Sequence, residues 1–327
     1  MPNSGKPMSC CLRTIVAMAL TLPAIAAWAQ AFPSKALKVI VPYSAGTATD
    51  VITRIVTNGL SERIKQPVVV ENRLGAGGIV GLTALKNSPP DGYTMGIIVS
   101  ANAVQPWLMK DLPIDIKKDF MPVTLTYSGP LVLTVPASFP AQTLAEFITY
   151  AKANPGKIFY GSVGTGSTAH MAGELLKQAA GFDMSVVPFK GTPEVYAAML
   201  GGNVHAIFDN YLVPKPLIDA GKLRLLGVAS RTRWPRLPQA PIIAESFPGF
   251  EVVFWTGFAA PQGTPREPFE KLAAEVRAVI NTPEIRQRIT DTGVDAGGNT
   301  PAEFSQMITA EVEKWGKVVK GAGMKAE

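Results

Sequence analysis

Residues 37–50 read LKVIVPYSAGTATD, and this stretch predicts a buried strand, a tight turn and the start of a helix. The run 39–41 is β-branched and apolar, as a central strand of a parallel sheet requires. Loop 44–49 has only small or hydroxyl side chains, so its backbone can approach a ligand, and Thr47 or Thr49 can cap the helix that follows. The free N–H groups at that helix end favour an anion.

A second stretch, residues 158–176, repeats this design. It predicts strand 158–162, a glycine and hydroxyl loop at 163–167, and helix 168–176. Because ligands of α/β proteins bind at such strand ends, two loops far apart in sequence indicate two lobes that face one cleft.

The N-terminal residues 1–29 have the pattern of a cleaved export signal. Lys6 and Arg13 precede an apolar run at 14–27, and Ala27-Trp28-Ala29 is a small-x-small cleavage site. We expect cleavage after Ala29 and a soluble, exported mature protein.

The composition excludes several classes of protein. Cys10 and Cys11 leave with the signal, so the mature protein has no thiol for a disulfide, a metal or a nucleophile. Cleavage lowers the formal net charge from +6 to +4, and Lys and Arg are scattered without interleaved aromatic residues. This pattern does not predict nucleic-acid binding.

The rest of the chain alternates strands and helices. This order is typical of a parallel sheet wound right-handed, whose binding sites lie beyond the carboxyl ends of the strands. Residues 75–78 and 100–102 also fall at such ends. The first half of the chain predicts helix 51–65, strand 68–72, helix 79–87 and strand 94–99.

Two lobes follow from the predicted crossings. Extended runs at 120–127 and 131–135 are separated by Ser128-Gly129-Pro130, which we expect to be a crossing between lobes, and run 252–260 can cross back. We therefore predict a discontinuous first lobe of residues 32–128 and 253–327 and a second lobe of 129–252. Helices that close the chain are predicted at 267–281, 284–291 and 301–320.

Cofactor and metal motifs are absent or incomplete. Residues 164–169 match the G-x-G-x-x-A dinucleotide pattern, but the next strand ends in Lys190 and not in the acid that would hold a ribose. His170 and His205 are the only histidines, and neither has the neighbours of a zinc signature. We expect no cofactor and no metal.

Several short segments of the chain form a recognisable set. They are IVPY at 40–43, QPVVVENR at 66–73, GAGG at 75–78, PDGYT at 90–94, PFKG at 188–191, GGNV at 201–204, FDN at 208–210, AGKLR at 220–224 and APQGTP at 260–265. Together they resemble the Bug family, the extracytoplasmic solute receptors of tripartite tricarboxylate transporters, and the resemblance covers residues 32–324.

This resemblance implies an α/β, two-lobed periplasmic-binding-protein fold of type II, with a small carboxylate in a cleft between the lobes. In the family, the loop after the first strand holds a glycine run followed by Thr-Asp. Here Gly46-Thr47-Ala48 replaces that run while Thr49-Asp50 remains. The replacement leaves the identity of the ligand open: a mono-, di- or tricarboxylate, aromatic or aliphatic.

The resemblance also implies which residues bind the ligand. Family members hold one carboxylate largely through backbone N–H groups and hydroxyls of the two loops. Matched residue by residue, the ligand-binding positions of this chain are Tyr43, Ser44, Thr47 and Thr49 from the first lobe, Ser162, Thr165, Gly166, Ser167 and Thr168 from the second, and Lys190, Thr192 and Asp209 for the distal part of the ligand.

The sequence therefore predicts a periplasmic solute-binding protein that captures a small organic carboxylate by lobe closure and delivers it to membrane permease subunits. We expect a monomer without catalytic residues. One alternative is an exported α/β hydrolase-like enzyme that uses Ser167 or His170, although G-x-S-x-G is absent. A second is a ligand sensor that signals to a membrane kinase.

Overall fold

The computed structural model describes residues 1, 2, 32–189 and 191–324. The predicted signal lies outside this part of the chain, apart from residues 1 and 2. The strands are β1 (Leu37–Val41), β2 (Val68–Asn72), β3 (Thr94–Val99), β4 (Phe120–Pro136), β5 (Phe159–Ser162), β6 (Ser185–Pro188), β7 (Ala206–Asn210), β8 (Leu223–Val228), β9 (Val253–Pro261) and β10 (Asp295–Ala296).

The helices separate these strands along most of the chain. They are α2 (Ala48–Ile64), α3 (Ile79–Lys86), α4 (Gln105–Leu108), α5 (Leu144–Ala153), α6 (Thr168–Ala180), α7 (Thr192–Leu200), α8 (Lys215–Asp219), α9 (Arg266–Ile280), α10 (Pro283–Asp291) and α11 (Pro301–Gly321), with 3₁₀ turns η1 (Ala76–Gly78), η2 (Ser100–Ala103) and η3 (Ile243–Glu245).

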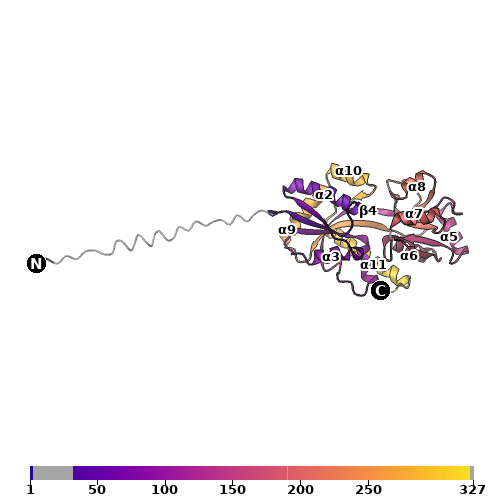
Figure 1. The fold of residues 1–327 in the computed structure, drawn as a ribbon, viewed down its shortest axis with the longest axis horizontal. Helices are drawn as coiled ribbons and strands as arrows, with labels where there is room; N and C mark the ends of the chain where they lie inside the picture. Colours follow the sequence, from indigo (N-terminus) through magenta and orange to yellow (C-terminus); the bar gives the residue numbers. More distant parts are fainter. Residues whose placement is uncertain (3–31, 190, 325–327) are drawn as a thin grey trace.

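The strands form one curled sheet in the order β2-β1-β3-β9-β4-β7-β5-β6, with β8 and β10 also paired to β4. Strand β1 is parallel to β2 and β3, and β5 is parallel to β6 and β7, whereas β4 and β9 are antiparallel to their neighbours. Helices α2, α3, α9 and α10 surround one end of the molecule and α5 to α8 the other, with β4 between them (Figure 1). The chain thus forms two α/β lobes, as expected.

Strand β4 is continuous, which corrects the expected break at Ser128-Gly129-Pro130. It pairs with β9 as far as Pro130 and with β7 from Leu131 onward. Proline is tolerated here because the ladder changes partner at this point, and the next N–H, that of Leu131, donates to the carbonyl of Val252 at 3.0 Å. The lobe boundaries at 128/129 and 252/253 stay a prediction.

The first loop and its helix form from local signals. Leu37 and residues 39–41 are buried, as the apolar run requires. Of the two candidate caps of α2, Thr47 is the cap: its hydroxyl accepts a hydrogen bond from the N–H of Asp50 at 3.4 Å. This cap ends the loop and begins α2 at Ala48.

The last helix, α11, connects the lobes. The indole N–H of Trp107 donates to the carbonyl of Val312 at 2.8 Å, and the amide of Gln178 in α6 donates to the carbonyl of Val318 at 2.7 Å. The largest buried cluster likewise includes Tyr160 of β5 and Trp255 of β9. The core therefore extends from one lobe into the other.

Candidate functional site

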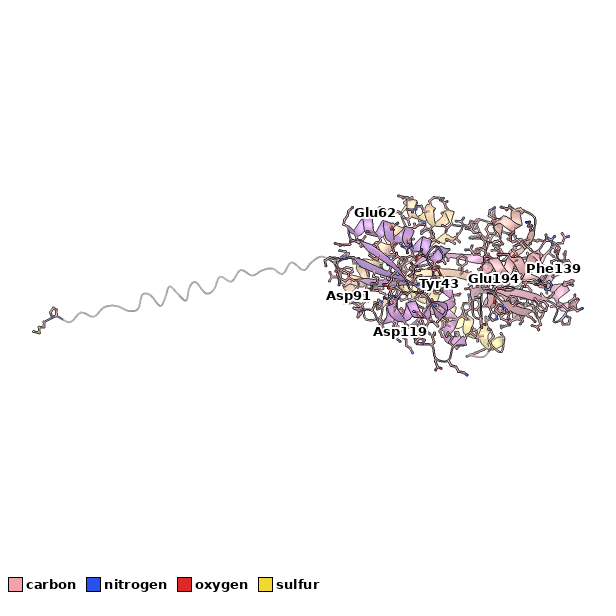
Figure 2. All side chains as sticks on the ribbon, viewed as in Figure 1. Tyr43, Glu62, Asp91, Asp119, Phe139 and Glu194 are labelled. Carbon is pink, nitrogen blue, oxygen red and sulfur yellow. The ribbon has the colours of Figure 1, made fainter. Side chains whose placement is uncertain are left out.

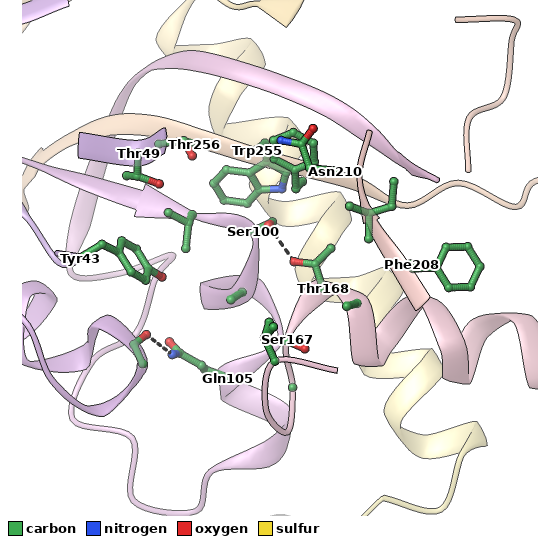
Figure 3. A pocket seen from close by; sticks show the side chains of 18 of the residues that line it. Tyr43, Thr49, Ser100, Gln105, Ser167, Thr168, Phe208, Asn210, Trp255 and Thr256 are labelled. Carbon is green, nitrogen blue, oxygen red and sulfur yellow. Dashed lines mark hydrogen bonds between the residues drawn. The ribbon is translucent and has the colours of Figure 1, made fainter. Parts of the chain in front are cut away.

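A pocket of about 630 Å³ lies where the lobes meet. Figure 2 places Tyr43, a wall residue, near the middle of the molecule, and Figure 3 shows the wall from close by. The described residues that line it are Tyr43, Thr49, Ala76, Gly77, Val99, Ser100, Ala101, Gln105, Leu108, Met109, Tyr127, Leu131, Val163, Thr165, Gly166, Ser167, Thr168, Ala169, Phe208, Asp209, Asn210, Phe254, Trp255 and Thr256.

Two tyrosines form part of the wall. Burial, with Tyr127 as a nearby second phenol, raises the pKa of Tyr43 to about 12, and burial also raises the pKa of Tyr127. The hydroxyls of Tyr127 and Thr49 are hydrogen-bonded at 3.1 Å. Both phenols are therefore neutral at physiological pH and present apolar rings with polar tips.

The N-terminus of α2 is already occupied by an acid. The carboxylate of Asp50 accepts hydrogen bonds from the N–H of Gly46 at 3.0 Å, from the guanidinium of Arg54 at 3.0 Å and from the amide of Asn72 at 2.8 Å. Burial raises the pKa of Asp50, but these hydrogen bonds outweigh burial and hold it below its usual value. The positive end of this helix dipole therefore already has an anion beside it.

The N-terminus of α6 is different, because its first turn contains no acidic residue. The hydroxyl of Ser167 caps the helix by accepting from the N–H of His170 at 3.2 Å. The first two N–H groups of α6, those of Thr168 and Ala169, have no acceptor among the described residues. Both residues line the pocket. This end can therefore bind an anion through free N–H groups, the Ser167 hydroxyl and the helix dipole.

The loop before α6 requires a glycine. Gly166 has φ +74°, in the left-handed region, and a Cβ there would lie 2.7 Å from Leu108 of the other lobe. The two lobes also touch through a hydrogen bond between the hydroxyls of Ser100 and Thr168 at 3.0 Å, drawn in Figure 3. These contacts bring η2 and α4 against loop 163–167.

Ser167 and His170 do not form a catalytic pair. The ring nitrogen Nδ1 of His170 accepts from the N–H of Gly166 at 3.1 Å, and Nε2 faces Glu174 at 3.9 Å. Burial lowers the pKa of His170. Neither ring nitrogen is hydrogen-bonded to the Ser167 hydroxyl, so the arrangement lacks the base contact that an activated serine needs.

The acid in the pocket wall is Asp209. Its carboxylate accepts from the hydroxyl of Tyr196 and from the N–H of Asn210, both at 2.8 Å. Burial raises the pKa of Asp209 to about 6. The carboxylate therefore titrates close to physiological pH, and it is negative above that value.

Most of the residues expected to bind ligand meet at this pocket. The wall contains Tyr43, Thr49, Thr165, Gly166, Ser167, Thr168 and Asp209. The others are not brought to the wall: Ser44 and Thr47 are exposed, Ser162 is fully buried, and Thr192 is half-buried at the start of α7. Lys190 lies outside the described residues. The ligand-binding role of all twelve stays a prediction.

Several wall residues were not proposed from the sequence. Ala76, Gly77, Ser100 and Ala101 belong to the strand ends at 75–78 and 100–102, so their position in the fold was a usable signal. Trp255 gave no such signal, because a tryptophan in an extended apolar run is typical of a core residue. In the structure its side chain is indeed only 1% exposed. It lines the pocket because β9 crosses between the lobes at this point.

No helix in the described part of the chain is long and apolar enough to cross a bilayer. Within the same residues, no group of three or more His, Cys, Asp or Glu side chains is arranged to hold a metal ion.

Known proteins match this chain over most of its length. The family model "Tripartite tricarboxylate transporter family receptor" (TctC) matches residues 52–324. BugT of Bordetella pertussis (strain Tohama I) is 31% identical over 300 residues, which cover 91% of this chain and 92% of BugT.

Solved structures agree with this match. R. palustris Rpa4515 with adipate is 33% identical with a TM-score of 0.80, covering 90% of this chain and 100% of that one. MatC (Rpa3494) from Rhodopseudomonas palustris with bound malate is 31% identical with a TM-score of 0.73, covering 88% and 100%. The resemblance to Bug proteins and the fold class expected from the sequence are thereby confirmed. The chain therefore belongs to the tripartite tricarboxylate transporter receptor family, whose members are periplasmic solute-binding proteins and not enzymes.

Proposed function

We propose that this protein is a periplasmic receptor that captures a small organic carboxylate between its lobes and delivers it to a tripartite tricarboxylate-type membrane transporter. The observation that carries the proposal is the difference between the two helix ends at the pocket. Asp50 occupies the end of α2, whereas the end of α6 has free N–H groups and no acid. A carboxylate placed against Ser167 and Thr168 would complete that end.

The relatives support the same class of ligand. Adipate and malate, found with Rpa4515 and MatC, are both small organic carboxylates. In this proposal the two lobes, residues 32–128 with 253–327 and residues 129–252, close over the ligand. The contacts Ser100–Thr168 and Leu108–Gly166 across the pocket are the kind that closure would form or tighten. The mature protein, cleaved after Ala29, acts as a monomer.

Thermal unfolding with a panel of acids and their primary amides tests the capture step. The amides keep the shape of each acid without its charge, so they are matched controls. At a hundred times the dissociation constant an acid should stabilise the protein by about 2.7 kcal/mol, and it should be recovered unchanged. Equal stabilisation by acid and amide, or conversion of the acid into a product, would contradict the proposal.

Uptake of a labelled acid by cells tests the delivery step. Cells that lack this receptor should accumulate the acid more slowly than cells that carry it, and a binding-deficient variant should not restore uptake. Uptake independent of the receptor, with binding confirmed in solution, would limit the protein to a role other than transport.

A further inference from the structure

The helices α2 and α6 start with the same local arrangement. A left-handed glycine comes first, Gly46 with φ +83° and Gly166 with φ +74°. A hydroxyl cap follows, Thr47 in the first lobe and Ser167 in the second. The side chain three residues after each cap turns back and accepts a hydrogen bond from the N–H of the glycine, as in a capping box shifted by one residue. The chemistry of this accepting side chain differs between the lobes.

In the first lobe the accepting side chain is an acid. The carboxylate of Asp50 accepts from the N–H of Gly46 at 3.0 Å, and Arg54, one turn later, forms an ion pair with it at 3.0 Å. Asp50 therefore holds its loop and at the same time places a negative charge at the positive end of α2. A carboxylate ligand at this end would meet a like charge.

In the second lobe the accepting side chain is a histidine. The ring nitrogen Nδ1 of the buried His170 accepts from the N–H of Gly166 at 3.1 Å. A neutral imidazole accepts through one nitrogen and donates through the other, so the ring proton of His170 is on Nε2. This nitrogen faces the carboxylate of Glu174, one turn later, at 3.9 Å, which favours a proton there. His170 thus fills the acceptor position with a neutral group.

The surroundings of the ring keep it uncharged. Burial is the largest effect on the pKa of His170 and lowers it, against the charge of Glu174, which raises it. Glu174 is itself balanced by an ion pair with Lys177 at 3.1 Å, and Lys177 also pairs with Asp183 at 3.1 Å. The hydroxyl of Tyr160 donates to Glu174 at 3.0 Å, and burial raises the pKa of this phenol. Around neutral pH both rings are therefore neutral.

We propose that His170 is a positioning residue for the anion site at the start of α6. Its neutral ring holds Gly166, and with it the loop that carries Ser167, in the conformation that binds a carboxylate. It does so without the negative charge that Asp50 brings to α2. The proposal rests on the receptor function proposed above, and it adds a residue that is not among the described residues of the pocket wall.

Three substitutions at His170 separate the hydrogen bond from the charge. His170→Asn keeps a neutral acceptor, because the carbonyl oxygen of asparagine lies close to the position of Nδ1, and Asp50 shows that a side chain of this length reaches the glycine. His170→Asp keeps the acceptor and adds a negative charge. His170→Leu keeps an apolar side chain of similar size to asparagine and removes the acceptor.

Calorimetric titration at neutral pH ranks these variants. Adipate, malate, hexanoate and benzoate are the probes, and the one that binds the wild type most tightly is used for all variants. We expect His170→Asn to bind within about threefold of the wild type and His170→Leu roughly fivefold more weakly, since the loop loses one hydrogen bond that preorganises it. His170→Asp should bind roughly a hundredfold more weakly, because two like charges meet in a partly buried site.

The matched control is His205→Asp. The Nδ1 of His205 also accepts from a backbone N–H, that of Phe159 at 3.0 Å, but this bond lies at the start of β5, whereas loop 163–167 follows the end of that strand. The control adds the same charge and replaces the same kind of bond away from the pocket wall. It should leave affinity within about twofold of the wild type. Melting curves check that all variants are folded.

Nitrogen NMR of the imidazole rings in the ligand-free protein gives a readout that packing alone does not determine. The sequence contains two histidines, so the signals of His170 are those lost in His170→Asn. We expect a neutral ring with its proton on Nε2. A proton on Nδ1, or a charged ring at neutral pH, would overturn the inference, because Nδ1 then has no lone pair for the N–H of Gly166.

The outcomes separate this inference from the receptor function itself. Wild-type affinity in a folded His170→Asp variant, or equal affinities of His170→Asn and His170→Leu, would overturn the inference and leave the receptor function intact. If His170→Asp does not fold, the comparison of asparagine with leucine and the position of the ring proton decide the matter. Failure of all four acids to bind the wild type would contradict the receptor function together with the inference.

Discussion

Removing the hydroxyl of Ser167 tests how the anion is held. In the structure this hydroxyl accepts from the N–H of His170 at 3.2 Å and lines the pocket. A serine hydroxyl can accept that bond and still donate its own proton. Ser167→Ala therefore removes two things: the cap of α6 and one hydrogen bond donated to a bound carboxylate.

The two losses have different sizes and different readouts. Loss of an N-cap costs about 1 kcal/mol of folding stability. Loss of a charge-assisted hydrogen bond costs about 1.5–3 kcal/mol of binding free energy, which corresponds to a roughly tenfold to hundredfold weaker affinity. We therefore expect a small decrease in melting temperature and a large increase in the dissociation constant.

The matched control is Thr143→Ala, which removes a cap of the same kind. The hydroxyl of Thr143 accepts from the N–H of Glu146 at 3.2 Å at the start of α5, and Thr143 is not part of the pocket wall. It should lower stability by a similar amount and leave affinity within about twofold. Calorimetric titration and thermal unfolding of both variants give the comparison. Wild-type affinity in a folded Ser167→Ala variant would refute the proposed role of this hydroxyl.

Three further perturbations follow from the same geometry. Gly166→Val should abolish binding, because φ of Gly166 is +74° and the new side chain would point at Leu108. Gly156 has φ +75° and open space around it, so the control Gly156→Val should cost similar backbone strain and leave the affinity measured by titration unchanged. Because burial raises the pKa of Asp209 to about 6, the folded protein binds this proton more tightly than the unfolded chain, so its ionised form costs stability above that pH. Asp209→Asn should therefore lose less stability than the wild type between pH 4 and pH 7, by up to about 3 kcal/mol in urea unfolding, and parallel pH profiles would exclude this effect. Saturating ligand should reduce the radius of gyration in solution scattering, and an unchanged radius with binding confirmed would argue against lobe closure.

Local sequence signals predicted much of this architecture. The apolar run at 39–41 and the cap at Thr47 depend only on neighbouring residues, and both are where the pattern indicated. The start of α6 at Thr168 is likewise where the pattern indicated, whereas its cap, Ser167, was predicted only as part of the loop. The continuity of β4 through Pro130 was not predicted, because it depends on an exchange of partners between β9 and β7.

The site was predicted in part for a related reason. Loop 163–167 contributes to the wall directly, so its residues could be named from the strand-loop-helix pattern. In the first loop the hydroxyl of Thr47 makes only local hydrogen bonds. It donates to the carbonyl of Ser44 and accepts from the N–H of Asp50 at the start of α2. The occupation of the α2 terminus by Asp50 depends partly on Asn72, which is distant in sequence. Such long-range pairing leaves no local signal.

The crystal structure of the protein with its tightest-binding acid tests the central claim most directly. We expect one carboxylate at the N-terminus of α6, with its oxygens about 2.5–2.7 Å from the Ser167 hydroxyl oxygen and about 2.7–2.9 Å from the backbone nitrogen of Thr168. The rest of the ligand should lie inside the pocket, beside lining residues such as Tyr127, Phe254 and Trp255. A carboxylate bound elsewhere, with the end of α6 in contact only with water, would contradict the account.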